Sequence, residues 1–147
     1  MHVSGSTSIN APRQKVYEYL TNPDFVSKCA PGLETMEVVE PNKKFKASGS
    51  VGLGNLKVRF SGDIEFLELD PPNRAKMKGH GTAPGSAVDG VAEMKLRDGE
   101  NGTTIMDWSA EVNVLGTIAA LASRMMGSIT QKLSGQFFDC VKAQIEK

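Results

Sequence analysis

Apolar and polar side chains alternate at the start of the chain, a pattern typical of a β-strand with one buried face. The buried face of this strand consists of Val3, Gly5, Thr7 and Ile9. Two helix-start signals follow, because Asn10-Ala11-Pro12 and Asn22-Pro23 each combine a capping residue with an early proline. They predict two short helices of about two turns each. The main residues of these helices are Val16, Tyr17, Tyr19 and Leu20 in the first, and Phe25, Val26 and Cys29 in the second, before Pro31-Gly32.

The middle of the chain, from about residue 33 to residue 114, alternates in the same way between turn sequences such as Pro41-Asn42, Gly54-Asn55 and Pro84-Gly85. We predict an antiparallel meander of six strands with one apolar and one polar face. Its inner face is expected to hold Phe45, Ala47, Gly49, Val51, Leu56, Val58, Phe60, Gly62, Ile64, Phe66, Ala75, Met77, Gly79, Gly81, Ala92, Met94, Leu96, Met106, Trp108, Ala110 and Val112.

In the last third of the chain, apolar residues recur every three or four positions, as on one face of an α-helix. We predict one long amphipathic helix from about Gly116 to Ile145. Gly127 and Gly135 lie inside it and cost about 1 kcal/mol each relative to alanine. They therefore either allow close packing or loosen the helix.

Taken in order, these elements predict an α+β fold with a seven-stranded antiparallel sheet, two short helices after the first strand and a long C-terminal helix. A length of 147 residues suits one domain, so we assign residues 1–147 to a single domain. A helix is ~10–12 Å across and cannot fill the concave face of so wide a twisted sheet. The pattern therefore predicts a cavity between sheet and helix.

Charge and composition narrow the range of functions that the protein could have. The 17 basic residues balance the 17 acidic ones, which disfavours nucleic-acid binding. The uncharged stretch 112–123 is shorter than the ~20 apolar residues of a membrane span, and residues 1–10 lack the regions of a secretory signal. Cys29 and Cys140 lie far apart without a CxxC motif. We expect a cytoplasmic protein with reduced thiols and no metal site.

Groups able to exchange protons are almost missing from the predicted inner face, and acid–base or nucleophilic catalysis needs such groups. His2 lies at the N-terminus, and His80 falls on the outward phase of its strand. Asp63 and Glu65 share an outward phase, which indicates a solvated face rather than a metal site. The glycine-rich segment 49–54 lacks the spacing of a phosphate loop and is expected to be a bent strand or hairpin end. We expect no catalytic residues.

Methionines on the predicted inner faces fit either ordinary core filling or a surface that adapts to varied apolar partners. For a ligand in the cavity, Thr103, Ser109 and Ser123 are candidate polar contacts. The candidate ligand-binding residues are Phe25, Phe45, Val58, Phe60, Ile64, Met77, Met94, Met106, Trp108, Ile118, Ala122, Met125 and Ile129.

Two adjacent segments carry a distinctive pattern. Residues 81–96 form a glycine-spaced strand, and residues 102–119 contain Gly-Thr, then Trp-x-Ala-x-Val, then Gly-x-Ile-Ala. This pattern resembles that of the carbon monoxide dehydrogenase G-subunit family. The segments Ile9-Asn-Ala-Pro12 and Cys29-Ala-Pro31-Gly32 are also similar, and the opening segment is shared across the wider START and polyketide-cyclase superfamily. The likeness covers nearly the entire chain.

The resemblance implies a helix-grip fold and a START-like ligand-binding domain without catalytic activity. It implies a carrier of a quinone or other lipid beside a molybdenum-containing carbon monoxide dehydrogenase-type enzyme, on the cytoplasmic side of the membrane. No cofactor is implied beyond such a bound quinone or lipid. Many relatives have a C-terminal extension that attaches to membrane, whereas this chain ends at Lys147. We therefore expect at most peripheral membrane contact.

Two alternatives remain, because one fold supports several functions. The first is a small cyclase- or hydrolase-type enzyme, for which Tyr17 and Tyr19 are the first residues to inspect. The second is an assembly factor that binds its dehydrogenase through a surface patch. In that case, substitution of a cavity residue such as Phe60 would leave partner binding intact.

Overall fold

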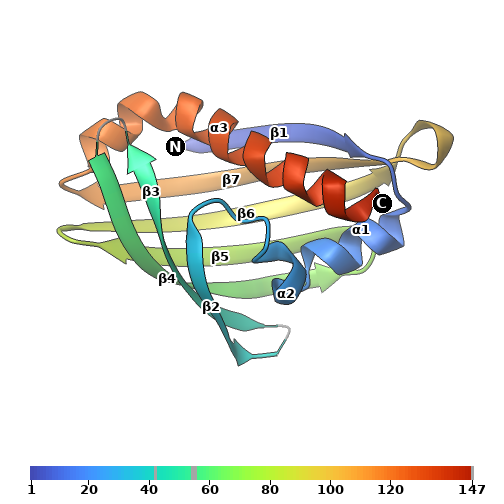
Figure 1. The fold of residues 1–147 in the computed structure, drawn as a ribbon, viewed down its shortest axis with the longest axis horizontal. Helices are drawn as coiled ribbons and strands as arrows, with labels where there is room; N and C mark the ends of the chain where they lie inside the picture. The colour runs from blue at the N-terminus through green and yellow to red at the C-terminus, as the bar shows by residue number, and fades with distance from the viewer. Residues whose placement is uncertain (42, 54–55, 147) are drawn as a thin grey trace.

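One antiparallel sheet of seven strands, with a long helix across one face, dominates the structure (Figure 1). The computed structural model describes residues 1–41, 43–53 and 56–146. The elements are β1 (His2–Ile9), α1 (Arg13–Leu20), α2 (Pro23–Val26), β2 (Leu33–Glu40), β3 (Lys44–Leu53), β4 (Leu56–Asp70), β5 (Arg74–Ala83), β6 (Ser86–Asp98), a 3-10 turn (Glu100–Gly102), β7 (Thr104–Gly116) and α3 (Ala119–Ile145). The predicted α+β fold is confirmed.

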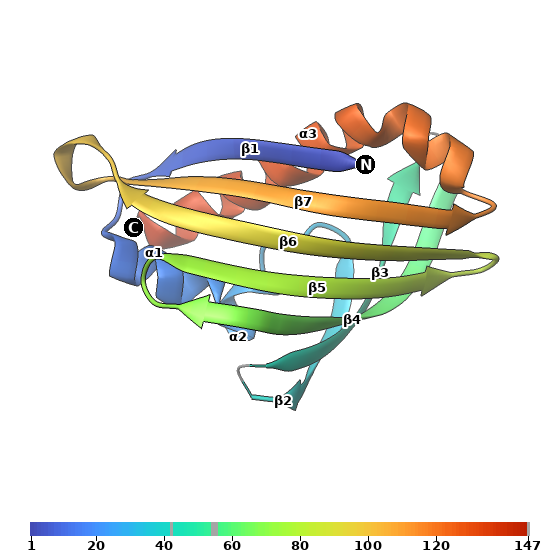
Figure 2. The same ribbon diagram turned by 180° about the vertical axis from the view of Figure 1, so that it is seen from behind.

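The sheet order is β1-β7-β6-β5-β4-β3-β2, so β2 to β7 form the predicted meander and β1 joins its far edge beside β7. Figure 2 shows this order from behind. Side-chain burial alternates along β1, with the even-numbered positions exposed, as the sequence predicts. The register places Ile64, Gly79, Gly90 and Val112 in one row across four strands. The row shares one face because opposite residues of paired strands point the same way.

The two short helices begin where the sequence indicates, but their details differ from the prediction. Asn22 caps α2, since its side chain accepts a hydrogen bond from the backbone N–H of Asp24 at 3.0 Å. Asn10 caps nothing, because α1 begins after Pro12 without a side-chain cap. The prediction of two turns for α2 is wrong: α2 has four residues, and Cys29 lies beyond its end. The chain turns after Val26 and carries Cys29 toward α3.

The long helix begins at Ala119 and not at the predicted Gly116. Gly116 ends β7 with φ of 93°, a left-handed conformation that glycine adopts without strain. A Cβ atom there would overlap the carbonyl oxygen of Gly85. By contrast, a Cβ atom on Gly127 or Gly135 would meet nothing within 4 Å, so close packing requires glycine at neither position.

The packing of α3 is uneven along its length. The helix crosses β1 and β7, and it also contacts β3, which curls round toward it (Figure 1). Its C-terminal half buries Val141 and Ile145 in a cluster with Ile9 and Val16. In its first half, Ala122 is the buried residue. The core therefore fills one end of the space between helix and sheet and leaves the other end less filled.

A disulfide joins Cys29 and Cys140 across 111 positions of sequence. The prediction of reduced thiols is wrong in this structure. Sequence spacing says nothing of distance between residues so far apart, and only the path of α3 back past α1 and α2 brings the two side chains together.

Within the described residues, no helix is both long and apolar enough to cross a membrane.

Candidate ligand-binding site

A hollow with two adjoining parts lies on the inner face of the sheet. We call them the glycine lobe, of about 440 Å³, and the aromatic lobe, of about 270 Å³. Ile64, Met77 and Ala92 line both lobes, so the two parts meet at these side chains. The hollow lies where the sequence predicts a cavity.

The glycine lobe owes its space to glycines on neighbouring strands. Gly62, Gly79, Gly81 and Gly90 lie on β4, β5 and β6 and line the lobe. The rest of its wall includes Val58, Phe60, Ile64 and Ile118, the residue before α3. A Cβ atom on Gly79 or Gly81 would approach nothing closer than a backbone oxygen at 3.7 Å. Backbone packing thus does not require these two glycines, and their effect is to keep the lobe open.

The aromatic lobe lies deeper, between the sheet and the helices. Its aromatic wall consists of Phe45, Phe66, Trp108, Phe137 and Phe138. The corner between α1 and α2 closes one side with Leu20, Thr21, Pro23 and Val26. The lobe is therefore bounded by both the sheet and the helices. None of the residues of α2 is itself buried.

Trp108 separates the aromatic lobe from a surface groove between β1 and α3. Its ring lies 6.5 Å from that of Phe138, measured between centroids. A Cβ atom on Gly5 would stand 2.8 Å from the indole atoms, so the absence of a side chain at residue 5 lets the indole lie against β1. The single tryptophan of the chain thus forms part of the wall of the hollow.

The structure gathers most of the residues proposed for ligand binding from the sequence. Lining the lobes are Phe45, Val58, Phe60, Ile64, Met77, Met94, Met106, Trp108 and Ile118. Phe25 instead stacks on Tyr19 at the surface and is 41% exposed. Ala122 is buried without lining either lobe, and Met125 and Ile129 lie on α3 outside the lining of both lobes. Helical periodicity marks the covered face of α3 but does not say which turns lie above the hollow.

Some residues that line the lobes were not among the ligand-binding candidates named from the sequence. They are the four glycines, Met36 of β2, Phe137 and Phe138 of α3, and the α1–α2 corner. The glycines carried a usable signal, because glycine at successive inward positions removes side-chain volume from one region of a sheet. Of the proposed polar contacts, Ser109 lines the aromatic lobe, whereas Thr103 donates to the Glu100 carbonyl in a turn and Ser123 is exposed.

Two ionisable groups near the hollow, Tyr17 and Glu93, are engaged by other partners. Tyr17 donates a hydrogen bond to the Arg74 carbonyl at 3.2 Å, and burial followed by the charge of Asp70 raises its pKa. Burial pushes the pKa of Glu93 upward, but hydrogen bonds from Arg74 and Lys95 outweigh it and hold that pKa below its ordinary value. Glu93 therefore stays ionised and paired at neutral pH.

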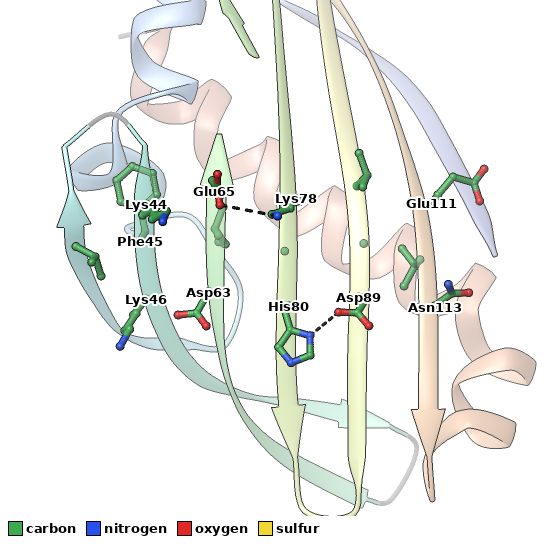
Figure 3. Close-up of a pocket in the computed structure, with 16 residues that line it drawn as sticks. Lys44, Phe45, Lys46, Asp63, Glu65, Lys78, His80, Asp89, Glu111 and Asn113 are labelled. Carbon is green, nitrogen blue, oxygen red and sulfur yellow. Dashed lines mark hydrogen bonds and ion pairs between the residues drawn. The ribbon is translucent and has the colours of Figure 1, made fainter. Parts of the chain in front are cut away.

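A second hollow, of about 650 Å³, lies on the opposite face of the sheet (Figure 3). Charged side chains of alternating sign cross it in rows, including Lys78 paired with Glu65 at 4.0 Å and His80 paired with Asp89. The side chains of His80 and Asp89 are both about half exposed, as the outward phase of His80 predicts. Cross-strand pairs of this kind satisfy one another in solvent. Among the described residues, no group of three or more side chains is placed to hold a metal ion.

Comparison with protein families identifies one whose pattern covers almost the entire chain. Residues 5–146 match the family described as the carbon monoxide dehydrogenase G-subunit (CoxG). Comparison with curated proteins finds no match.

Solved structures share the fold. A conserved protein from Geobacillus kaustophilus superposes with a TM-score of 0.91 at 24% identity, covering 99% of this chain and 95% of that one. The Zhui aromatase/cyclase from Streptomyces sp. R1128 gives 0.73 at 16% identity, with coverage of 99% and 93%. A protein from Thermus thermophilus gives 0.68 at 14% identity, with coverage of 99% and 97%. These likenesses confirm the helix-grip fold.

Proposed function

Because the chain belongs to the CoxG family, we propose that it is a non-catalytic carrier of a hydrophobic ligand, a quinone or another lipid. The observation that carries this proposal is the inner hollow, whose two lobes adjoin and are lined almost throughout by apolar side chains. Small-molecule sites are commonly apolar hollows of ~300–1,000 Å³. The lobes, of about 440 and 270 Å³, fall within or near that range.

The energetics favour a chain-like apolar ligand. Each methylene removed from water contributes ~0.8 kcal/mol, so one five-carbon isoprene unit supplies ~3–4 kcal/mol before ordering costs. The glycine lobe suits such a tail, because it has no side chains at four inward positions. Of the thirteen residues named from the sequence, we propose the nine that line the lobes as ligand contacts.

The proposal excludes turnover by this chain. Tyr17 and Tyr19, the residues favoured for an enzyme, lie outside the lining of both lobes, and their hydroxyls face backbone carbonyls. One observation favours the alternative, since a solved structure with the same fold is an aromatase/cyclase. Conversion of a bound polyketide or ester by the purified protein, lost in Tyr17→Phe or Tyr19→Phe, would establish the enzyme hypothesis.

For partners, we propose a molybdenum-containing dehydrogenase in the cytoplasm, on the basis of the family alone. Affinity capture of the dehydrogenase by the tagged full chain tests this. The carrier and assembly-factor hypotheses then separate by a cavity substitution. If the protein is a carrier, Phe60→Ala should lose the hydrophobic ligand. If it is an assembly factor, Phe60→Ala should still bind the dehydrogenase and support its assembly.

Peripheral membrane contact is also part of the proposal, at the end of the sheet where the β5–β6 hairpin lines the glycine lobe. Leu115 is 59% exposed there, and Arg124 is the one ionisable residue in the segments 81–88 and 113–124. Exposed apolar groups beside cations suit anionic lipid headgroups. Flotation with vesicles containing phosphatidylglycerol should decrease for Leu115→Ser and remain for Leu67→Ser, a change of an exposed leucine elsewhere.

The decisive experiment is direct ligand detection. Native mass spectrometry and solvent extraction of the purified full chain should reveal a copurifying lipid. Titration with an alkyl-tailed quinone should quench the fluorescence of Trp108, which lines the aromatic lobe. If neither a ligand nor quenching is found, the carrier proposal is wrong.

A matched pair of variants locates the binding. Gly81→Leu places a side chain in the glycine lobe without a backbone clash, so it should weaken quinone binding at least ~10-fold by removing volume for roughly two methylenes. Asn113→Leu adds the same side chain on the opposite face and should leave binding unchanged (Figure 3). Equal effects of both variants would place the quinone outside the lobe.

A further inference from the structure

The segment that contains α2 covers the aromatic lobe and is attached to α1, β3 and α3. It runs from Asn22 to Gly32, which has φ of 77°, and it contributes Pro23 and Val26 to the lining of the lobe. Phe25 stacks on Tyr19 with a centroid separation of 5.1 Å. At the far end, the Gly32 carbonyl accepts a hydrogen bond from the backbone N–H of Ser50 at 2.9 Å. Between these points, the disulfide ties the segment covalently to α3.

The disulfide lies directly beside the lobe that the segment covers. Phe137 and Phe138, which line the lobe from α3, precede Cys140 by three and two positions. Val26, which lines it from α2, precedes Cys29 by three. The bond thus joins two walls of the aromatic lobe. We propose that Cys29 and Cys140 form a thiol–disulfide switch, which fixes residues 22–32 over the aromatic lobe when oxidised and releases them when reduced.

The surroundings of the two sulfurs indicate which one an external thiolate attacks and which one leaves. Cys140 is partly exposed, whereas Cys29 is 5% exposed, so an external thiolate reaches the Sγ of Cys140 first. The Tyr19 hydroxyl lies 3.6 Å from the Sγ of Cys29. Burial raises the pKa of Tyr19, so the hydroxyl keeps its proton and can donate to the departing Cys29 thiolate. Stabilising the leaving thiolate speeds exchange.

The reductant is a dithiol protein of the thioredoxin class or two molecules of a small thiol. Its thiolate forms a bond to the Sγ of Cys140, the bond between the two cysteines breaks, and the electron pair stays on Cys29, which takes a proton from solvent. A second thiol then attacks the mixed disulfide and releases Cys140 as a thiolate. Two electrons pass to the protein, and the reductant ends as a disulfide. Such reversible disulfides are the kind found in cytosolic proteins.

The effect of the switch on ligand release rests on the proposed function, but the switch itself can be measured without a ligand. Alkylation of the full chain purified without reductant should find no free thiol, and alkylation after glutathione treatment should modify both cysteines. Reduction should then increase amide hydrogen exchange in residues 22–32 at least ~5-fold, the lower end of typical coupling between sites. Exchange in β5, β6 and β7 should not change. Free thiols in the unreduced protein, or unchanged exchange after reduction, would overturn the switch.

Variants and a probe extend the test. Cys140→Ser should show the rapid exchange of the reduced protein with or without glutathione, and if it does not fold, the wild-type comparison above still decides. Tyr19→Phe keeps the stacked ring but removes the hydroxyl, so it should slow reduction. Because that hydroxyl also donates to the Phe25 carbonyl, the exchange of residues 22–32 in this variant is compared with that of the same variant in its oxidised form. The fluorescent probe 1-anilinonaphthalene-8-sulfonate should dissociate faster from the reduced protein. Failure of the probe to bind in either state would count against the carrier function and not against the switch.

Discussion

Thr104 shows how one polar side chain can be accommodated in the core. It is fully buried at the start of β7, and its hydroxyl donates to the carbonyl of Ala11 at 2.7 Å. This bond fastens the segment between β1 and α1 to the sheet. A buried carbonyl that loses such a donor keeps its desolvation cost without compensation.

Thr104→Val removes the donor and keeps the shape of the side chain. The free energy of unfolding should fall by about 1–3 kcal/mol, because the Ala11 carbonyl is left unsatisfied. Urea denaturation followed by circular dichroism measures this. Thr104→Ser, which keeps the hydroxyl, is the control and should retain more of the stability. A loss in Thr104→Ser as large as in Thr104→Val would show that the methyl group matters rather than the hydrogen bond.

Asp107 links three strands on the outer face. Hydrogen bonds from Arg97 and then from Ser6 hold its pKa below the ordinary value of 3.8. A carboxyl whose pKa is lower in the folded state stabilises the fold above its unfolded pKa, and this stability disappears as the pH falls through the folded value. The stability advantage of the wild type over Asp107→Asn should therefore be full at about pH 6 and shrink below pH 3.8. Urea midpoints at about pH 6 and at about pH 2.5 test this, and a constant difference between wild type and variant would contradict it.

At the scale of elements, helix starts and strand phases were predictable while helix boundaries set by tertiary contacts were not. The alternation along β1 and the prolines at the starts of α1 and α2 are local signals, and the structure follows them. Gly116 was misassigned to α3 because a strand-ending glycine and a helix-starting glycine look alike in sequence. Its left-handed φ accompanies the close approach of Gly85 in the neighbouring hairpin.

Alanine substitutions of the two α3 glycines and of Gly116 should change the stability in opposite directions. Gly127→Ala and Gly135→Ala should each raise the free energy of unfolding by about 0.4–1 kcal/mol, since alanine restricts the unfolded chain and meets nothing within 4 Å in the helix. Gly116→Ala should lower it, because of the left-handed φ and the overlap with Gly85. Thermal and urea unfolding of the three variants decides. Destabilisation by Gly127→Ala would mean that this glycine is needed for a contact.

At the scale of the whole molecule, the disulfide closes a loop that includes most of the chain. Cys29 and Cys140 are 111 positions apart, and cross-linking distant residues restricts the unfolded chain more than cross-linking near ones. The double variant Cys29→Ser and Cys140→Ser should unfold with a free energy about 2–4 kcal/mol below that of the oxidised wild type. Urea titration with and without glutathione measures it, and the double variant should be indifferent to glutathione. Equal stability of variant and oxidised wild type would refute this prediction.

The sequence by itself determined the strands, the inward and outward faces and the long helix, because these follow from side-chain periodicity and local turn residues. It also determined most of the apolar residues that line the hollow, since strand phase fixes which way each one points. The tertiary structure alone decided that Cys29 meets Cys140, that α2 covers the aromatic lobe, and that Phe25, Met125 and Ile129 lie away from it. Such facts depend on where α3 crosses the sheet. That crossing is set by packing among residues far apart in the chain, and no local pattern encodes it.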